Sequence, residues 1–422
     1  MSEPTERSAT HRYLIVVPVA FVPVADGRAA IESAFAEHLK LLLDSLAPAV
    51  QQIEVIAPLL PAASDTTGMC VLDPCDDRIR FVAAYPNSIG RVAYWLALPR
   101  LMARVWQAVG RARFVHAGPS TFYRPLENFA LLFGWLRRRT TIYVTDIDQR
   151  QSPRMCYQTE QWSFGVYVRA RFLHQKWENL QHHIARWICS MMLLKGRALV
   201  RDFGRGKSKV HYILDSAYSR EMILATERQA ARWIRIDDAS RPMRACYFGR
   251  LVTYKGIDRM LQAIAAAREA GADVTLDLYG GGDQEAELRS LAGSLGLQDA
   301  VRFHGVRTYG LEFFRELDDY DVLLAAPLSE DTPRSALDAQ ALGMPILAFD
   351  TYYYRELAEF GAGVCVVAWP DVAALAEQMV RLFRDRSALV ALGQRGIVFA
   401  AQNTQESWLE RRAVWTLAVA RS

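Results

Sequence analysis

The sequence lacks an apolar run long enough to cross a membrane. A bilayer-spanning helix needs about 20 apolar residues, and the longest candidate, residues 184–199, is interrupted by Arg186, Lys195 and Arg197. Residues 1–12 are polar and mixed in charge, so we expect no secretory signal. These absences favour a cytoplasmic protein.

Cysteine is scarce, and the glycine pattern of a dehydrogenase is missing. Six cysteines are spread along the chain, and the close pair Cys70 and Cys75 has neither a zinc nor a thioredoxin spacing. This predicts reduced thiols rather than a disulfide framework. After Gly280, Glu285 occupies the third glycine position of Gly-x-Gly-x-x-Gly, which excludes a dinucleotide-binding fingerprint.

A strong charge of one sign is absent as well. The 50 basic residues against 46 acidic ones give a net charge of +4, from which we expect no nucleic-acid partner. With 51% hydrophobic and 23% charged residues, the composition is that of an ordinary globular protein. A length of 422 residues is enough for two or three domains.

Short apolar segments alternate with helical patterns along both halves, which predicts parallel sheets. Strands are expected in the first half at 13–18, 53–58, 80–84, 114–116 and 140–145, with a helix at 31–46. Residues 169–194 are helical and rich in Trp, His and Arg, and their strands and turns cannot be placed. Residues 236–242 have the composition of a linker.

The alternation restarts after that linker. Strands are expected at 245–248, 274–279, 301–303, 321–325, 346–349 and 363–367, and helices at 284–295, 333–343, 371–385 and 405–419. The chain is therefore predicted to be of the α/β class, with two Rossmann-like doubly wound domains, 1–238 and 239–403, facing across a cleft. Ligands of such sheets bind at the carboxyl ends of the strands.

Two segments of the second half are suited to binding a diphosphate. Gly249 ends a strand and lets the backbone approach a ligand. Arg250 and Lys255 lie on the loop that follows, where two cations can hold a diphosphate and stabilise its charge as it leaves. Taken alone, these residues are equally well explained as surface cations on a loop.

The second segment starts with Glu330 and continues into a helix. Pro333 suits the start of that helix, so the N–H groups of Arg334 and Ser335 would be free to meet phosphate oxygens. Asp338 lies inside the helix, eight residues after Glu330. Ordinary capping and a solvated carboxylate explain this pattern equally well in isolation.

The serial order of the motifs is more specific than any one of them. Gly280 opens a glycine turn after one strand, and His304 ends the next, where it could face a nucleobase. The order resembles the donor domain of retaining GT-B glycosyltransferases of family 4 (glycosyl transferases group 1) over roughly residues 243–400. The segments that carry the resemblance are FGRLVTYKG at 248–256, LYGGG at 278–282, VRFHG at 301–305, Glu330-x7-Asp338, and ALGMP at 341–345.

The resemblance implies roles for individual residues. Arg250 and Lys255 would bind the donor diphosphate, and Glu330 would contact the donor sugar. Asp338, where the family has Glu, would take the ribose hydroxyls. It also implies a hexosyltransferase-type enzyme that works with retention and without metal or cofactor, and a C-terminal helix, 404–422, that crosses back to the N-terminal domain.

The first half resembles the family less. The family's glycine-rich loop is reduced to Gly27, and Asp146 stands where relatives place a His that contacts the sugar. His116 ends a strand and could line the acceptor side, although a lone His there is more often structural. Asp146 and Asp148 spell Asp-x-Asp, the metal motif of a different glycosyltransferase fold, and we expect no metal here.

We therefore expect transfer of a sugar from a nucleoside-diphosphate sugar to a hydroxyl of a glycan or lipid-linked acceptor. Residues 135–139 and 177–201 mix cations with tryptophan, which suits either a peripheral contact at the inner membrane face or a solvated basic face. Two alternatives stay open: a non-catalytic nucleotide-sugar-binding protein, and a nucleotide-sugar epimerase on the same fold.

Overall fold

The computed structural model describes residues 11–24, 28–62, 64, 69–72 and 78–420, and the chain forms two compact units. The first unit combines residues 1–146, 168–213 and 408–422. The second combines residues 147–167 and 214–407. Each half of the sequence therefore contributes to both units. None of the helices in the described ranges is long and apolar enough to cross a membrane.

The first unit is built on a parallel sheet. Among the described residues, its strands lie in the order β10-β9-β8-β7-β1-β4-β6, a doubly wound order that reverses between β1 and β7. These strands are β1 (Arg12–Val16), β4 (Gln52–Leu59), β6 (Ile79–Pro86), β7 (Phe114–Ala117), β8 (Thr140–Thr145), β9 (Met191–Leu194) and β10 (Val210–Tyr212). A small antiparallel sheet holds β2 (Val22–Pro23), β3 (Ala29–Glu32) and β5 (Met69–Val71).

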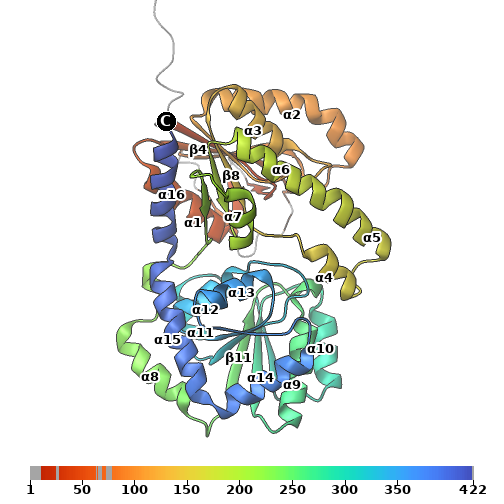
Figure 1. The fold of residues 1–422 in the computed structure, drawn as a ribbon, viewed down its shortest axis with the longest axis vertical. Helices are drawn as coiled ribbons and strands as arrows, with labels where there is room; N and C mark the ends of the chain where they lie inside the picture. Colours follow the sequence, from red (N-terminus) through yellow and green to blue (C-terminus); the bar gives the residue numbers. More distant parts are fainter. Residues whose placement is uncertain (1–10, 25–27, 63, 65–68, 73–77, 421–422) are drawn as a thin grey trace, which may run out of the picture. The chain divides into compact units, whose positions relative to one another are not determined.

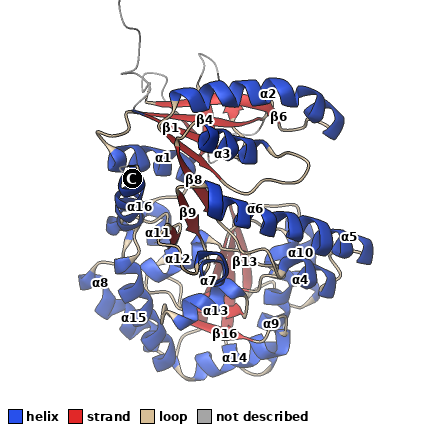
Figure 2. Ribbon diagram, turned by 45° about the horizontal axis from the view of Figure 1, so that its top comes forward, coloured by secondary structure: helices blue, strands red, loops and turns tan. Residues whose placement is uncertain are grey.

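Helices cover both faces of this sheet (Figure 2). One face carries α2, α3, α6 and α7 around a core that includes Tyr94 and Leu131, and the other carries α1 and α16 around Leu39 and Leu409. Figure 1 shows α16, at the blue end of the chain, beside α1. The helical elements are α1 (Ser33–Leu46), α2 (Arg91–Arg111), α3 (Leu126–Leu136), η3 (Ala170–His174), α6 (Gln175–Ile188), α7 (Arg197–Gly204) and α16 (Gln405–Val419).

The second unit repeats the same plan. In the part of the chain that the structure describes, its parallel strands lie in the order β13-β12-β11-β14-β15-β16, with the reversal between β11 and β14. They are β11 (Met243–Phe248), β12 (Val274–Tyr279), β13 (Val301–Gly305), β14 (Val322–Ala325), β15 (Ile346–Phe349) and β16 (Val364–Val367). Most of their side chains are buried, as expected for a parallel sheet covered on both faces.

The remaining helices surround this second sheet or lie at its margin (Figure 1). They are α4 (Ser152–Gln158), α5 (Phe164–Arg169), η4 (Arg220–Met222), α8 (Thr226–Asp237), η5 (Thr253–Lys255), α9 (Ile257–Glu269), α10 (Glu285–Ser294), α11 (Leu311–Leu317), α12 (Arg334–Ala341), α13 (Tyr352–Glu359), α14 (Val372–Arg384) and α15 (Arg386–Gln402). Asp371 caps α14, since its side chain accepts a hydrogen bond from the backbone N of Ala374 at 3.0 Å.

The second unit includes residues from Leu214 onward, well before the boundary expected at residue 238, and the segment taken for a linker is fastened to it. Arg232 on α8 is 2% exposed and donates to Asp318 Oδ1 at 2.9 Å and to the carbonyl of Tyr320 at 2.7 Å. Arg241 pairs with the buried carboxylate of Asp321 at 2.6 Å. These buried ion pairs fasten residues 226–242 to the second sheet.

Candidate functional site

The strand order places two of the predicted segments next to each other. The loop with Gly249, Arg250 and Lys255 follows β11, and the segment that leads to Glu330 follows β14, the neighbour of β11 across the reversal point. At such a point the two connections leave the sheet on opposite sides and open a crevice at the carboxyl edge. The proposed donor residues therefore meet at this edge of the second sheet.

Glycines allow the backbone of this edge to pack closely. A Cβ on Gly280 would lie 1.9 Å from the carbonyl oxygen of Gly249, and a Cβ on Gly256 would lie 1.9 Å from that of Ala326. Both glycines also have positive φ, 131° and 65°. The glycines therefore allow the loops after β11, β12 and β14 to pack against one another. This packing fixes the backbone positions of Arg250 and Lys255.

The two cations of the loop are held differently. Arg250 is exposed and donates from Nη2 to the hydroxyl of Tyr254 at 2.6 Å. Lys255 is mostly buried and forms an ion pair with Asp331, with side chains 13% and 14% exposed. The lysine to which the family resemblance assigns a phosphate is thus paired with a carboxylate in this structure. No role for Asp331 was predicted, although it directly follows Glu330 in the sequence.

Glu330 is buried at the same edge. Its Oε1 accepts a hydrogen bond from the backbone N of Tyr352 at 3.1 Å, and the residue is 7% exposed. Burial raises the pKa of Glu330 to about 7, and the carboxylate of Asp148 adds to the rise. Asp148 is itself paired with Arg150 at 2.6 Å. The segment 147–167 thus brings a carboxylate from the N-terminal half of the sequence to the second unit, which the sequence did not reveal.

The helix α12 begins where the motif predicts. Pro333 is its N-cap residue, so the N–H groups of Arg334 and Ser335 lie in the first turn, at the positive end of the helix dipole. Asp338 is one turn further, 3% exposed, and accepts a hydrogen bond from the hydroxyl of Tyr309 at 3.0 Å. Burial raises the pKa of Asp338 to about 7.

His304 lies at the end of β13 with its ring held on both sides. Nε2 is 2.6 Å from Oδ1 of the buried Asp277, and the ring stacks on Tyr279 with centroids 4.5 Å apart. These contacts fix the orientation of the imidazole beside Gly280. A contact between His304 and a nucleobase stays a prediction.

The candidates of the first half lie in the first unit or outside the described residues. His116 is buried, and its Nδ1 accepts a hydrogen bond from Arg412 on α16 at 3.0 Å. Burial lowers the pKa of His116 well below its usual value, and Arg412 contributes to the decrease. Asp146 is exposed directly after β8, and Gly27 falls outside the described residues. His116 therefore has a structural contact, and its acceptor role stays a prediction.

Over the described ranges, no group of three or more His, Cys, Asp or Glu side chains is placed to hold a metal ion. Five of the cysteines are free thiols, and Cys75 lies outside the described residues. The site is therefore made of cations, carboxylates and backbone N–H groups.

Residues 236–398, which contain this site, match the model of the family described as glycosyl transferases group 1. The matched region begins within α8 and ends within α15, so it covers the second sheet and all the candidate residues from Gly249 onward.

Curated glycosyltransferases are similar in sequence to part of this chain. The chain is 26% identical over 160 residues to the amylovoran biosynthesis glycosyltransferase AmsK of Erwinia amylovora, which covers 36% of this chain and 39% of that protein. It is 26% identical over 219 residues to the alpha-D-kanosaminyltransferase of Streptomyces kanamyceticus, covering 50% and 54%. The chain thus spans about half or less of the length of these relatives.

Solved structures extend the likeness to both units. HepE of Anabaena in complex with UDP has a TM-score of 0.63 at 16% identity, covering 96% of this chain and 99% of that one. The sucrose-phosphate synthase of Thermosynechococcus elongatus has a TM-score of 0.67 at 17% identity, covering 98% and 100%. At such identities the likeness shows the fold, which is the predicted GT-B architecture of two Rossmann-like units.

Proposed function

We propose that the protein is a glycosyltransferase that moves a sugar from a nucleoside-diphosphate sugar to a hydroxyl of a glycan or a lipid-linked acceptor. The observation that carries the proposal is the meeting of Arg250, Lys255, Glu330 and the start of α12 at one edge of the matched region. Uridine diphosphate is the first nucleotide to test, because the structure of HepE that resembles this chain contains it.

In the proposed mechanism these residues stabilise charge that develops on the leaving group. Arg250 and Lys255 balance the negative charge of the departing diphosphate, and the N–H groups of Arg334 and Ser335 bind its oxygens. Protein cations therefore take the place of a metal ion. In this proposal Glu330 binds a hydroxyl of the donor sugar.

The proposed stereochemistry needs no nucleophile from the protein. The acceptor oxygen attacks the anomeric carbon on the face from which the diphosphate leaves, so the configuration is retained. The acceptor proton passes to the leaving phosphate, which makes the step balanced without a further reactant. Asp338 accepts hydrogen bonds from the ribose hydroxyls after it has lost its proton, or after the hydrogen bond from the Tyr309 hydroxyl has broken.

A panel of UDP, GDP, ADP, TDP and CMP tests the donor site by thermal unfolding of the wild type and of Lys255→Ala. A nucleotide at about 100 times its dissociation constant adds about 2.7 kcal/mol to the stability of the folded state. We expect one nucleotide to raise the melting temperature of the wild type, and the variant to lose that shift.

Turnover of the matching nucleotide sugar then separates an enzyme from a binding protein. We expect nucleoside diphosphate to be released in the presence of an acceptor, at a rate that a chelator does not change. NMR of the product should show the same anomeric configuration as in the donor sugar. Binding without sugar release under any acceptor would favour the non-catalytic alternative. An epimerised or free sugar formed without acceptor would favour the epimerase.

A further inference from the structure

One segment of the first unit contributes many arginines and almost no acidic side chains. Among the described residues, only Arg78 and Arg111 of these arginines form ion pairs with acidic side chains, Asp44 and Glu54. Residues 78–145 contain eleven arginines and no lysine or aspartate, and the single acidic residue is Glu127. Glu127 is 3% exposed in the core beneath α2 and α3, and burial raises its pKa to about 7. The exposed charge contributed by this segment is therefore entirely basic, in a chain whose overall charge is nearly balanced.

The same segment exposes large apolar side chains. On α2, whose inner face buries Tyr94 and Leu98, the outer side exposes 76% of Val92, 47% of Trp95 and 77% of Leu96. The neighbouring helix α3 exposes half of Trp135 and of Leu136. These helices are therefore apolar on the face turned away from the sheet as well as on the face that packs on it.

Arginines lie among these exposed apolar side chains. Arg91, Arg100 and Arg104 are exposed on α2, and Arg138 is exposed at the end of α3. Arg137 stacks its guanidinium over Trp106 of α2, 3.9 Å from the ring centroid, which joins the two helices. A pattern of tryptophan, aliphatic and arginine side chains on one helical face is typical of a helix that lies in a membrane interface.

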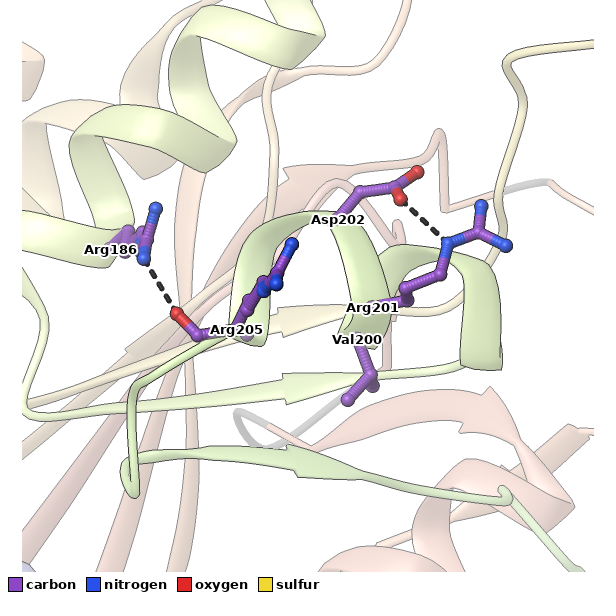
Figure 3. Close-up of a pocket in the computed structure, with 6 residues that line it drawn as sticks. Arg186, Val200, Arg201, Asp202 and Arg205 are labelled. Atoms are coloured by element: carbon purple, nitrogen blue, oxygen red, sulfur yellow. Dashed lines mark hydrogen bonds and ion pairs between the residues drawn. The ribbon is translucent and has the colours of Figure 1, made fainter.

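The helix layer continues from α3 to α6 and α7 (Figures 1 and 2). Leu180, Ile184 and Trp187 are exposed on α6. At the end of this helix, Arg186, Arg201 and Arg205 line an open hollow (Figure 3). Asp202 is the acid of this hollow, and Arg201 Nε donates to it at 2.9 Å, which leaves the lining with a net positive charge.

We propose that the outer face of α2 and α3, continued by α6 and α7, docks on the surface of an anionic lipid bilayer. The arginines meet lipid phosphates, and the tryptophans and aliphatic side chains enter the headgroup region. A second copy of the chain is a poorer occupant, because a symmetric contact would set this arginine-rich face against itself. A nucleic acid offers no apolar counterpart for Val92 and Leu96. The proposal stands independently of the sugar transfer.

Sedimentation with lipid vesicles tests this surface. The full chain is mixed with vesicles of phosphatidylcholine, or of phosphatidylcholine with phosphatidylglycerol, at low and high salt. We expect binding to the anionic vesicles that weakens with salt. The double variant Arg100→Gln/Arg104→Gln should bind them about 30-fold less, because each cation near an anionic surface contributes about a factor of five.

A second variant tests the exposed apolar side chains of the proposed membrane surface, with matched controls. Trp95→Ser/Leu96→Ser should lose binding at both salt concentrations, since it removes the side chains that enter the headgroup region. Arg384→Gln/Arg395→Gln and Val398→Ser change exposed residues of α14 and α15 and should bind as the wild type does. Thermal unfolding checks that every variant is folded.

Three outcomes would overturn the proposal. The wild type could stay in the supernatant with anionic vesicles at low salt, the control variants could lose as much binding as the surface variants, or a DNA duplex could displace the protein from the vesicles. None of these results bears on nucleotide binding, so failure of the membrane surface and failure of the donor site are distinguishable.

Discussion

At the residue scale, the ion pair between Lys255 and Asp331 sets the charge of the proposed donor site before a ligand arrives. A diphosphate that binds Lys255 must either displace the carboxylate of Asp331 or bind close to it, where the two negative charges repel each other. Asp331→Asn keeps the shape and removes the negative charge, so we expect UDP to bind about tenfold more tightly. Titration calorimetry measures this change.

The matched control for that substitution is Asp299→Asn. Asp299 is exposed just before β13, at the amino end of the strands and away from the edge that holds Lys255. Its substitution should leave the affinity for UDP unchanged. Equal tightening by both variants would point to the general charge of the unit, and no tightening by Asp331→Asn would contradict the proposed phosphate position.

The buried carboxyl of Asp338 predicts a pH dependence of stability. Its pKa of about 7 lies above the usual 3.8, so the folded protein holds a proton that the unfolded chain releases. The stabilisation is complete below about pH 4 and is lost as the pH rises through about 7. Asp338→Asn should flatten this part of the dependence, as measured by urea unfolding at a series of pH values.

Glu330 contributes a dependence of the same sign, because burial also raises its pKa to about 7. Part of the slope should therefore survive in Asp338→Asn and decrease further when Glu330→Gln is added, while the buried Glu127, whose pKa is also raised to about 7, still contributes. A slope that is unchanged in the double variant would show that these two carboxyls ionise freely in the folded protein.

The sequence located the candidate side chains but not their partners. Arg250, Lys255, Glu330 and Asp338 stand out because each follows a predicted strand in a fixed order. The carboxylate of Asp148 reaches Glu330 through the fold across more than a hundred residues of chain, and no local pattern signals such a contact. For the same reason the sequence does not show that Arg412 covers His116.

At the element scale, the glycines at the carboxyl edge predict a large effect of a single methyl group. Gly280→Ala places a Cβ 1.9 Å from the oxygen of Gly249 at a φ of 131°, where other residues are strained. We expect a loss of about 3 kcal/mol of unfolding free energy, combining backbone strain with the displaced loop. Denaturant unfolding of the wild type and the variant measures the loss.

A glycine in open space provides the contrast. Gly293 lies in α10, and a Cβ there would meet no atom within 4 Å. Gly293→Ala should therefore stabilise the protein by up to about 1 kcal/mol, since alanine is the better helix former. Similar losses in both variants would mean that the close approach of the two backbones does not control stability at Gly280.

The strands of the second unit were predictable because each is an apolar segment between clear turns. The sequence missed β9 and β10, which are short, Met191–Leu194 and Val210–Tyr212, and follow a long helical stretch. Periodicity cannot separate a short apolar strand from a buried turn of helix. The helix expected from residue 31 begins at Ser33, because Ala29–Glu32 pairs as β3 with neighbouring strands.

At the scale of the whole molecule, the return of α16 to the first unit predicts an effect far from its place in the sequence. Leu409 is 4% exposed in the core shared with α1 and the first sheet. Leu409→Ala should cost about 2–4 kcal/mol, as buried leucines do when a cavity is left. Hydrogen exchange should speed up in β1 and β7 and stay unchanged in β11 and β12.

Faster exchange in β11 and β12 instead would mean that the helix stabilises the second unit. The overall division into two doubly wound sheets was predictable from the alternation of strands and helices. The sequence did not predict that residues 147–167 and 214–238 belong to the second unit. They join it through buried contacts such as those of Arg232, which no local pattern signals.

The interleaved order of segments also sets the order in which the protein can fold as it leaves the ribosome. Domains generally form as units during synthesis, and the second unit is complete in sequence once Ser407 has emerged. The first unit, although it begins the chain, still waits for Trp408–Ser422 to cover the core around Leu39. The core of the N-terminal sheet can therefore close only after α16 has emerged, later than the sheet's own strands.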